Sequence, residues 1–266
     1  MHKRALSVVV AAGFAILLIA ASARAEIRTG TVAYKSGHVE AHSYLAYDDA
    51  RGGRRPGILV VPEWWGLVDY PKMRARMLAR LGYVTLAVDV YGDGKTAATS
   101  DQAAALSRAL EQGDRGELRA RLAAALAELR HNPRVDPDRV AAIGYCFGGL
   151  SVLELARSGA DLKGVVSFHG PLDASTPARR GQVKAQILVC TGADDPYVPP
   201  AKVQAFEQEM RNAGADFEIN IYSGAKHSFT NPAADQWHSP ALAYNREADH
   251  RSWQAMRDFF AEIFER

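Results

Sequence analysis

Residues 140–149 read Val-Ala-Ala-Ile-Gly-Tyr-Cys-Phe-Gly-Gly, and this stretch decides the fold. It joins a short apolar run, typical of a buried strand, to a helical pattern over 150–158. Inside it lies Gly144-Tyr145-Cys146-Phe147-Gly148, which has the form of the G-x-S-x-G turn with Cys in place of Ser. Such a turn is so tight that side chains at the two glycine positions would strike the neighbouring strand and helix. We therefore predict a strand–turn–helix unit that carries Cys146 at its apex.

The sulfur of Cys146 is predicted to project at the first turn of that helix. The helix dipole and the free N–H groups there favour a thiolate, which is the nucleophilic form of cysteine. The alternative is an inert, buried cysteine beside a glycine-rich packing turn. The motif in its strand–turn–helix setting favours the nucleophile.

The chain on either side alternates strand-like and helix-like segments. Predicted parallel strands are short, nearly continuous apolar runs at 57–61, 83–88, 140–144, 164–168, 186–190 and 217–222. Predicted helices lie between or after them, at 72–81, 101–130 with a break near Gly113 and Gly116, 150–158, 201–213 and 245–265. An antiparallel hairpin over 31–34 and 39–47, turning at Ser36-Gly37, precedes them. This order predicts an α/β fold, with a mostly parallel, doubly wound sheet and helices on both faces.

A nucleophilic thiol needs a base, and the base needs a group that orients it. In sheets of this type the chain order is nucleophile, acid, histidine, and ligands bind beyond the carboxyl ends of the strands. His227 fits this order because it follows the last predicted strand, whereas His169 precedes every candidate acid. Asp194 and Asp195 both follow the preceding strand, and spacing alone does not choose between them. Pro196 disfavours the helical region for Asp195, which suits a fixed carboxylate.

Composition excludes several classes of protein. The chain has 266 residues, of which 48% are hydrophobic and 23% charged, as in globular proteins. Lys+Arg is 32 against 30 for Asp+Glu, a balance that does not supply the basic surface required for nucleic-acid binding. Two cysteines form at most one disulfide, so the fold must rest on its hydrophobic core.

The first 25 residues have the features of a signal peptide. Lys3 and Arg4 form a positive start, residues 8–21 are apolar, and Ala23-Arg24-Ala25 has the small-x-small form of a cleavage site. The apolar stretch spans about 21 Å as a helix, which is shorter than the hydrocarbon core of a bilayer. We therefore expect an exported protein, periplasmic or secreted, whose mature chain is a single domain over 26–266. An uncleaved membrane anchor is the alternative.

Several motifs resemble those of the dienelactone hydrolase family of α/β-hydrolases. They are Gly-Tyr-Cys-Phe-Gly-Gly at 144–149, Gly-Ala-Asp-Asp-Pro-Tyr-Val-Pro at 192–199, Lys-His-Ser-Phe at 226–229 and Pro-Glu-Trp-Trp-Gly at 62–66. The resemblance covers about residues 30–265, and it implies an α/β-hydrolase fold for the mature chain.

The same resemblance implies roles for individual residues. It assigns the catalytic triad to Cys146, Asp195 and His227, which selects Asp195 over its neighbour. It places the oxyanion hole at the N–H groups of Phe147 and Trp64. It also matches Glu63 to a glutamate that interacts with the resting thiol and helps to activate it when substrate arrives. An ordinary paired carboxylate is the alternative for Glu63.

The sequence departs from the family at the substrate site. Family members that open dienelactones hold the substrate carboxylate with two arginines, and the corresponding stretches 90–95 and 228–231 contain none. Lys95 is the cation that remains, and it lacks the bidentate fork of arginine. Together with Trp64, the side chains of Trp65, Tyr91 and Tyr145 predict a more aromatic and less cationic substrate site. Packing in the core or at the rim is the alternative for these four.

The combined prediction is a carboxylic ester hydrolase that cleaves a small ester or lactone through a thioester on Cys146. We expect no metal or organic cofactor, because no Cys/His cluster has zinc-ligand spacing and no glycine run matches a nucleotide-binding fingerprint. The expected partner is a small-molecule substrate, not a nucleic acid or a membrane, and the mature chain is expected to be a monomer or weak dimer. The alternatives are a redox-active protein that uses Cys146 and Cys190, and a binding protein with a vestigial hydrolase site.

Overall fold

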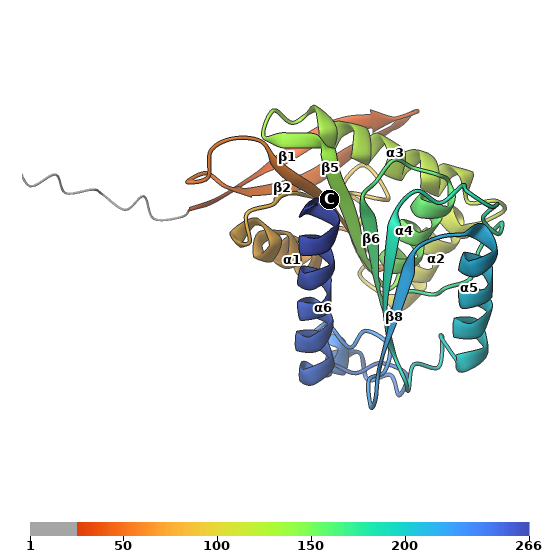
Figure 1. Cartoon of the computed structure of the whole chain (residues 1–266). Helices are drawn as coiled ribbons and strands as arrows, with labels where there is room; N and C mark the ends of the chain where they lie inside the picture. Colours follow the sequence, from red (N-terminus) through yellow and green to blue (C-terminus); the bar gives the residue numbers. More distant parts are fainter. Residues whose placement is uncertain (1–25, 266) are drawn as a thin grey trace, which may run out of the picture.

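The computed structural model describes residues 26–265, so the predicted signal peptide at 1–25 lies outside the described residues. These residues build one eight-stranded sheet in the order β1-β2-β4-β3-β5-β6-β7-β8 (Figure 1). The strands are β1 (Ile27–Ser36), β2 (Val39–Asp48), β3 (Arg55–Val61), β4 (Val84–Ala87), β5 (Val135–Tyr145), β6 (Gly164–Phe168), β7 (Gln186–Gly192) and β8 (Phe217–Tyr222).

The sheet is parallel from β4 to β8, and its other end is the antiparallel hairpin of β1 and β2. The hairpin turns at Gly37, whose φ of +59° lies in the left-handed region that glycine adopts without strain. β2 then pairs antiparallel with β4 and so attaches the hairpin to the sheet. The prediction of a mostly parallel sheet with an N-terminal antiparallel hairpin is confirmed.

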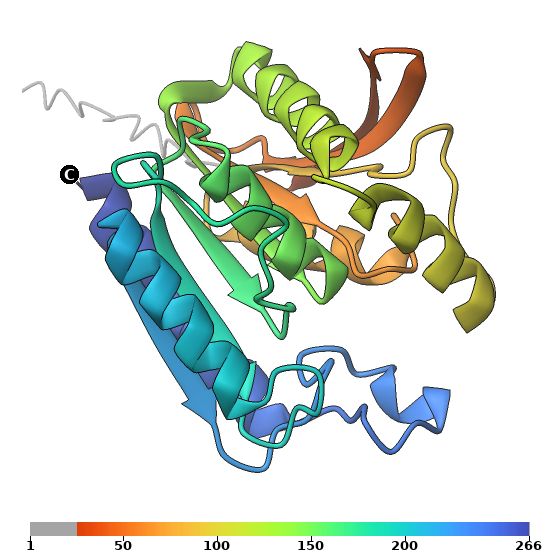
Figure 2. The same cartoon turned by 90° about the vertical axis from the view of Figure 1, so that its right-hand side faces the viewer.

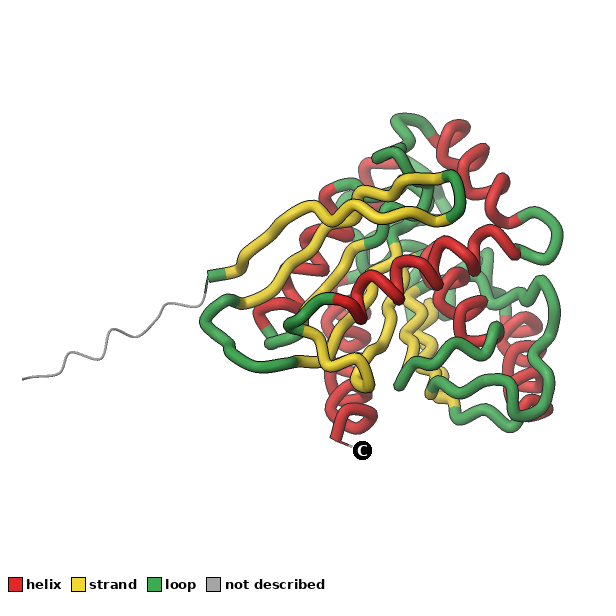
Figure 3. Tube along the Cα trace, turned by 90° about the horizontal axis from the view of Figure 1, so that it is seen from above, coloured by secondary structure: helices red, strands yellow, loops and turns green. Residues whose placement is uncertain are grey.

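Helices cover both faces of the sheet, as predicted (Figures 1 and 3). They are α1 (Asp69–Arg80), α2 (Ser100–Glu111), α3 (Gly116–His131), α4 (Phe147–Arg157), α5 (Pro200–Ala213) and α6 (Arg246–Glu265), with a short 3-10 helix η1 (Ala234–Trp237). α1 and α6 pack on one face, and α2 to α5 contribute to the core on the other (Figure 2). The strands between them are apolar on both sides: Ile58 and Val60 face one core, whereas Leu59 and Val61 face the other.

The helical pattern over 101–130 is broken where glycine predicted a break. α2 ends at Glu111 and α3 begins at Gly116, and the turn between them holds Gly113 at φ +60° and Arg115 at φ +59°. Within residues 26–265, no helix is both long enough and apolar enough to cross a membrane.

Candidate active site

Cys146 lies at the sharp turn between β5 and α4, with a φ of +53° and a ψ of −117°. A Cβ on Gly144 would collide with the carbonyl of Gly148, and a Cβ on Gly148 would collide with the carbonyl of Val61. The Cys146 carbonyl accepts the N–H groups of Gly149 at 2.8 Å and Leu150 at 3.2 Å. Only glycine therefore fits on either side of the turn, which explains the spacing of the motif.

The turn brings Cys146 into a continuous hydrogen-bonded chain with His227 and Asp195. The Sγ of Cys146 lies 3.0 Å from Nε2 of His227, and Nδ1 of His227 lies 2.8 Å from Oδ2 of Asp195. The histidine follows β8 and the aspartate follows β7, so three carboxyl ends of the sheet supply the three groups. Oδ1 of Asp195 accepts the backbone N–H of Tyr197 at 2.9 Å, which fixes the carboxylate. His227 and Asp195 are buried, and Cys146 is half-buried.

The electrostatic environment favours a charged His227. Burial lowers the pKa of His227, but the neighbouring Cys146 sulfur and the Asp195 carboxylate outweigh it and raise that pKa to about 10. The imidazolium form is therefore stabilised at neutral pH next to the sulfur.

The two residues predicted to supply the oxyanion hole lie at the cavity that contains Cys146. Phe147 is the first residue of α4, and Trp64 follows β3; both line the same cavity as Cys146. Among the described residues, neither N–H has a hydrogen-bond acceptor, so both are free to bind an oxygen. The carbonyl of Trp64 is fixed by the Tyr91 hydroxyl, which donates to it at 2.9 Å.

A cavity of about 490 Å³ opens above Cys146 and His227. Its walls come mainly from the segment after β3, from α2 and from the segment after β8. Trp65 contacts Trp64 with ring centroids 5.4 Å apart and Trp237 at 5.3 Å. The remaining lining residues are Ser100, Ala104, Ser107, Arg108, Glu111, Pro171, Tyr197, Ser228, Ser239 and Leu242. The cavity that contains the thiol therefore combines aromatic side chains with the charged side chains of Arg108 and Glu111.

Glu63 has different partners from those that the resemblance implied. It is buried after β3, and it accepts hydrogen bonds from Ser228 Oγ at 3.1 Å and Asn231 Nδ2 at 2.6 Å. Burial raises the pKa of Glu63, and the hydrogen bond from Asn231 opposes this. In the structure the thiol of Cys146 contacts His227. The carboxylate of Glu63 is instead bound by Ser228 and Asn231, on the segment that follows the histidine.

Three predicted substrate-binding residues do not line the cavity. Tyr145 is fully buried and stacks on Phe168, because the strand alternation turns it to the α1–α6 face. Tyr91 is buried against Phe147 and acts on the cavity only through Trp64. Lys95 is exposed and pairs with Asp93 at 2.8 Å. Trp65, the other residue predicted to bind substrate, borders the cavity beside Trp64.

The sequence reasoning also missed two aromatic residues of the cavity. Trp237 lies in η1, ten residues after His227, and no local pattern in that segment indicates where its ring points. Tyr197 packs edge-to-face on the His227 ring with centroids 4.9 Å apart. Its place directly after Asp195-Pro196 is the signal that could have identified it.

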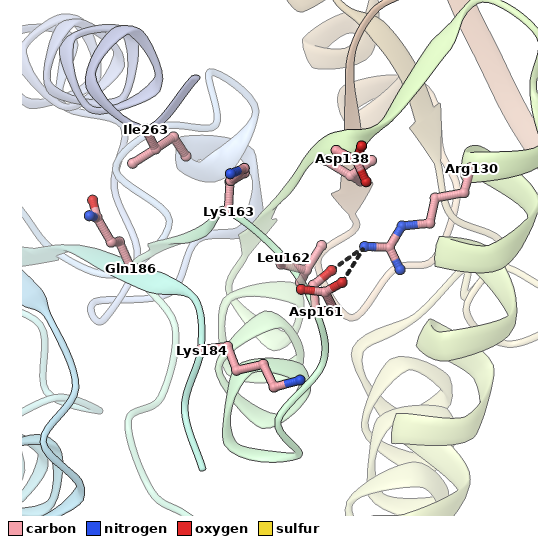
Figure 4. A pocket seen from close by; sticks show the side chains of 9 residues that line it. Arg130, Asp138, Asp161, Leu162, Lys163, Lys184, Gln186 and Ile263 are labelled. Carbon is pink, nitrogen blue, oxygen red and sulfur yellow. Dashed lines mark hydrogen bonds and ion pairs between the residues drawn. The ribbon is translucent and has the colours of Figure 1, made fainter. Parts of the chain in front are cut away.

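A second cavity of about 490 Å³ lies near the amino ends of β6 and β7, away from the thiol (Figure 4). It is lined by charged side chains, of which Arg130 pairs with Asp161, and it contains none of the predicted site residues. Cys190 is also remote from solvent: it is fully buried on β7, where the Tyr222 hydroxyl donates to its sulfur at 3.6 Å. No group of three or more His, Cys, Asp or Glu within residues 26–265 could hold a metal ion.

The sheet order and the strained turn that carries Cys146 define an α/β-hydrolase. The model of the dienelactone hydrolase family matches residues 42–264, and the chain belongs to the dienelactone hydrolase family.

Comparisons with individual proteins agree with this assignment. Among solved structures, "m3DLH" superimposes with a TM-score of 0.86 and 42% identity, covering 90% of this chain and 99% of that chain. A dienelactone hydrolase-like promiscuous phosphotriesterase from metagenomic libraries superimposes with a TM-score of 0.84 and 39% identity, covering 90% of this chain and 99% of that chain. A protein of Synechocystis sp. that carries the name "Putative carboxymethylenebutenolidase" is 27% identical over 247 residues, which are 88% of this chain and 97% of that protein. The chain is thus a carboxylic ester hydrolase.

Proposed function

We propose that this protein hydrolyses a small ester or lactone through a covalent thioester on Cys146. The observation that carries the proposal is the chain from Cys146 Sγ to His227 at 3.0 Å and from His227 to Asp195 at 2.8 Å, at the floor of an aromatic cavity. This is the arrangement of nucleophile, base and orienting acid that acyl transfer requires.

In the first half of the reaction, the sulfur of Cys146 attacks the carbonyl carbon and forms a C–S bond. The carbonyl oxygen becomes an oxyanion, which the N–H groups of Phe147 and Trp64 stabilise. Such donors contribute about 3–4 kcal/mol each in the transition state. The C–O bond of the ester then breaks, and the leaving oxygen takes the proton of His227, either as it departs or after it has left as a stabilised enolate.

In the second half, water hydrolyses the thioester. Neutral His227 takes a proton from the water while the hydroxyl oxygen bonds to the acyl carbon. Collapse of the tetrahedral intermediate releases the acid and returns the sulfur to its place beside the imidazolium. Asp195 keeps the imidazole in the required orientation throughout, through its 2.8 Å hydrogen bond.

The cavity favours a neutral substrate with a flat apolar group over dienelactone itself. Trp64, Trp65 and Trp237 line the cavity that contains Cys146, and rings of this kind bind flat apolar groups by stacking and edge contacts. Lys95 pairs with Asp93 on the surface and does not line the cavity, whereas Arg108 and Glu111 of α2 line it with one positive and one negative side chain. Because a relative is named a promiscuous phosphotriesterase, an aryl phosphotriester belongs beside aryl esters among the first probes.

The decisive experiment measures hydrolysis of a short-chain nitrophenyl ester by wild type, Cys146→Ala and Cys190→Ala. We expect Cys146→Ala to abolish turnover and Cys190→Ala to retain it. Rapid quenching and mass spectrometry of the wild type should show one acyl group on Cys146. Full activity of Cys146→Ala would overturn the proposal.

The redox alternative has less support. Burial raises the pKa of the Cys190 thiol to about 12, which disfavours the thiolate needed for disulfide exchange. A thiol titration that finds two free cysteines in the purified native protein would exclude a Cys146–Cys190 disulfide.

We further propose that the chain is exported and acts in the periplasm or outside the cell, as a monomer or weak dimer. The support for export is the sequence of residues 1–25, which has a basic start, an apolar stretch and the segment Ala23-Arg24-Ala25. Amino-terminal sequencing of the protein recovered from an expressing bacterium should begin at Glu26. Sedimentation of that mature protein measures its oligomeric state.

A further inference from the structure

His169 is a buried imidazole that the proposed mechanism does not use. It follows β6, the strand between those that carry Cys146 and Asp195, and it has no exposed surface. Its backbone φ is +41°, which is uncommon for a residue other than glycine. Its ring packs edge-to-face against His227, with centroids 5.4 Å apart.

Both ring nitrogens of His169 are engaged. The backbone N–H of Cys146 donates to Nδ1 at 3.1 Å, and the same N–H donates to the carbonyl of Phe168 at 3.0 Å. On the opposite side of the ring, Nε2 lies 2.7 Å from Oγ1 of Thr230. Thr230 is three residues after His227, so one imidazole connects the nucleophile's backbone to the segment that carries the base.

These contacts require a neutral ring with its hydrogen on Nε2. Nδ1 accepts the Cys146 N–H and therefore carries no hydrogen, which leaves Nε2 to donate to Thr230. Burial lowers the pKa of His169 well below its ordinary value, and the positive charges of His227 and Arg74 lower it further. A protonated ring would instead place two N–H groups against each other at Cys146.

The far end of this connection is anchored in the helices. Thr230 Oγ1 lies 2.6 Å from the hydroxyl of Tyr70, and the Thr230 carbonyl accepts a hydrogen bond from Arg74 at 2.6 Å. Arg74 also pairs with Asp249 of α6 at 2.6 Å. The segment after β8 is thus held by α1 and α6, while His169 holds it to the turn before α4.

We propose that His169 is a positioning residue. By bridging the Cys146 amide and Thr230, it keeps the Cys146 sulfur and the His227 ring at the distance and orientation that the reaction needs. A strained backbone such as that of Cys146 persists only where its surroundings determine it fully. Small displacements of a nucleophile from its base cost large factors in rate. The role of this bridge in turnover rests on the proposed hydrolysis.

The test uses three substitutions of His169 and one of Thr230, which remove the two hydrogen bonds separately or together. His169→Asn keeps an acceptor near the position of Nδ1 and loses the contact with Thr230. His169→Gln keeps a polar group near the position of Nε2 and loses the acceptor for Cys146. His169→Phe loses both at similar size. Thr230→Val removes the second contact from the other side, so the test does not depend on one variant folding. Phe206→Leu in α5, a core change remote from the bridge, is the stability control.

Two readouts are needed: kcat and KM for the nitrophenyl ester, and the rate at which iodoacetamide alkylates Cys146. We expect His169→Phe to lower kcat roughly 10- to 100-fold with KM within about twofold, and to slow alkylation. His169→Asn and His169→Gln should each recover part of kcat, and Thr230→Val should resemble His169→Asn. Phe206→Leu should lower the thermal midpoint without a comparable loss of kcat.

The proposal is overturned if His169→Phe keeps kcat and the alkylation rate within about twofold of wild type. It is equally overturned if Asn and Gln recover nothing, or if Phe206→Leu loses as much kcat at an equal loss of thermal midpoint. Alkylation does not require hydrolysis. A wild type without Cys146-dependent turnover would therefore reject the proposed function, while the alkylation rates would still test the positioning role.

Discussion

Cys146 combines a strained backbone with a charged neighbour. A residue held at φ +53° and ψ −117° carries about 1–3 kcal/mol of conformational strain. Its main-chain carbonyl and N–H are fixed by Gly149, Leu150 and Phe168. Burial lowers the pKa of His227, but the Cys146 sulfur and the Asp195 carboxylate together raise it to about 10. The turn therefore holds the sulfur beside the imidazole, and the sulfur contributes, with Asp195, to the raised pKa of His227.

This coupling predicts the titration of His227 in a serine variant. Cys146→Ser removes the sulfur that helps to raise the pKa of His227 but leaves the burial, so that pKa should fall from about 10 and the ring should be less protonated at pH 8. The check is an NMR titration of the histidine side chains from pH 5 to 11. The buried ring of His169 should not titrate in either protein. An unchanged pKa of His227 would show that Asp195 alone sets it.

The aromatic wall predicts which substitutions change substrate binding. Trp65→Ala and Trp237→Ala should each raise KM for an aryl ester by roughly 2- to 10-fold, since an aromatic contact is worth about 0.5–1.5 kcal/mol. Lys95→Ala is the matched control, because its ammonium faces Asp93 and not the cavity. Steady-state kinetics with a neutral aryl ester measures both effects. A larger rise of KM in Lys95→Ala than in the tryptophan variants would contradict this description of the site.

At the residue scale, the sequence predicted the groups that local rules determine. The glycine spacing identifies Cys146, and the chain order identifies the histidine after β8. Side-chain direction was less accessible. Tyr145 adjoins the nucleophile in sequence, yet it shares the face of Ile143 and points to the other core. The bridge through His169 was also missed, because chain order excludes it as the base and no local pattern indicates a contact with Thr230.

At the scale of elements, α4 is held by ion pairs as well as by its apolar contacts. Glu154 is fully buried, and its carboxylate lies within 3.0 Å of Arg115, 3.0 Å of Arg119 and 3.4 Å of Arg157. Arg157 in turn pairs with Glu209 of α5 at 2.8 Å. The helix that begins at the nucleophile is thereby tied to both of its neighbours.

Neutralising this carboxylate should destabilise the protein strongly. Glu154→Gln removes the buried carboxylate that Arg115, Arg119 and Arg157 share and leaves Arg157 with Glu209 alone. Breaking a buried ion pair in this way costs about 3–5 kcal/mol. Urea unfolding measures the difference. Glu207→Gln, which removes an exposed i,i+4 pair with Arg211, should cost no more than about 0.5 kcal/mol. An equal loss of unfolding free energy in the two variants would show that the buried ion pairs stabilise the protein no more than an exposed pair does.

Element ends were harder to predict than element types. The sequence places a strand at 140–144, but β5 begins at Val135, because its first two residues pair with Arg55 and Pro56. The pairing then shifts register between Pro56 and Gly57. Pro137 stands within that irregular segment and carries no strand pattern. Only the partner strand reveals this pairing, and a single segment of sequence does not contain it.

At the scale of the whole molecule, Glu63 connects two distant parts of the chain at the expense of stability. It follows β3, and its partners Ser228 and Asn231 follow β8. Burial raises its pKa above the ordinary value, so the folded protein holds this proton to higher pH than the unfolded chain does. Ionisation of Glu63 therefore costs stability as the pH rises through the folded-state pKa.

It follows that Glu63→Gln should stabilise the fold at high pH. The variant has no charge to bury, so its thermal midpoint at pH 8 should exceed that of wild type by roughly 2–4 °C for each kcal/mol of relief. The difference should vanish below the ordinary carboxyl pKa of 4.5, where both proteins are neutral at this position. Calorimetry across that range provides the check, with the exposed Glu218→Gln as control. A lower midpoint at pH 8 would mean that the two hydrogen bonds outweigh the burial.

The exposed turn between α2 and α3 divides the proposed catalytic residues unequally between the two parts of the chain. A cut near Gly113 leaves Cys146, Asp195 and His227 together on the later fragment, while Trp64 and the inner strands β3 and β4 stay on the earlier one. The two pieces can rejoin only by re-forming the parallel pairing of β3 with β5. If each fragment were fused to one of two proteins that associate, hydrolysis of a nitrophenyl ester would report that association, because the coloured product would form only after the sheet had reassembled.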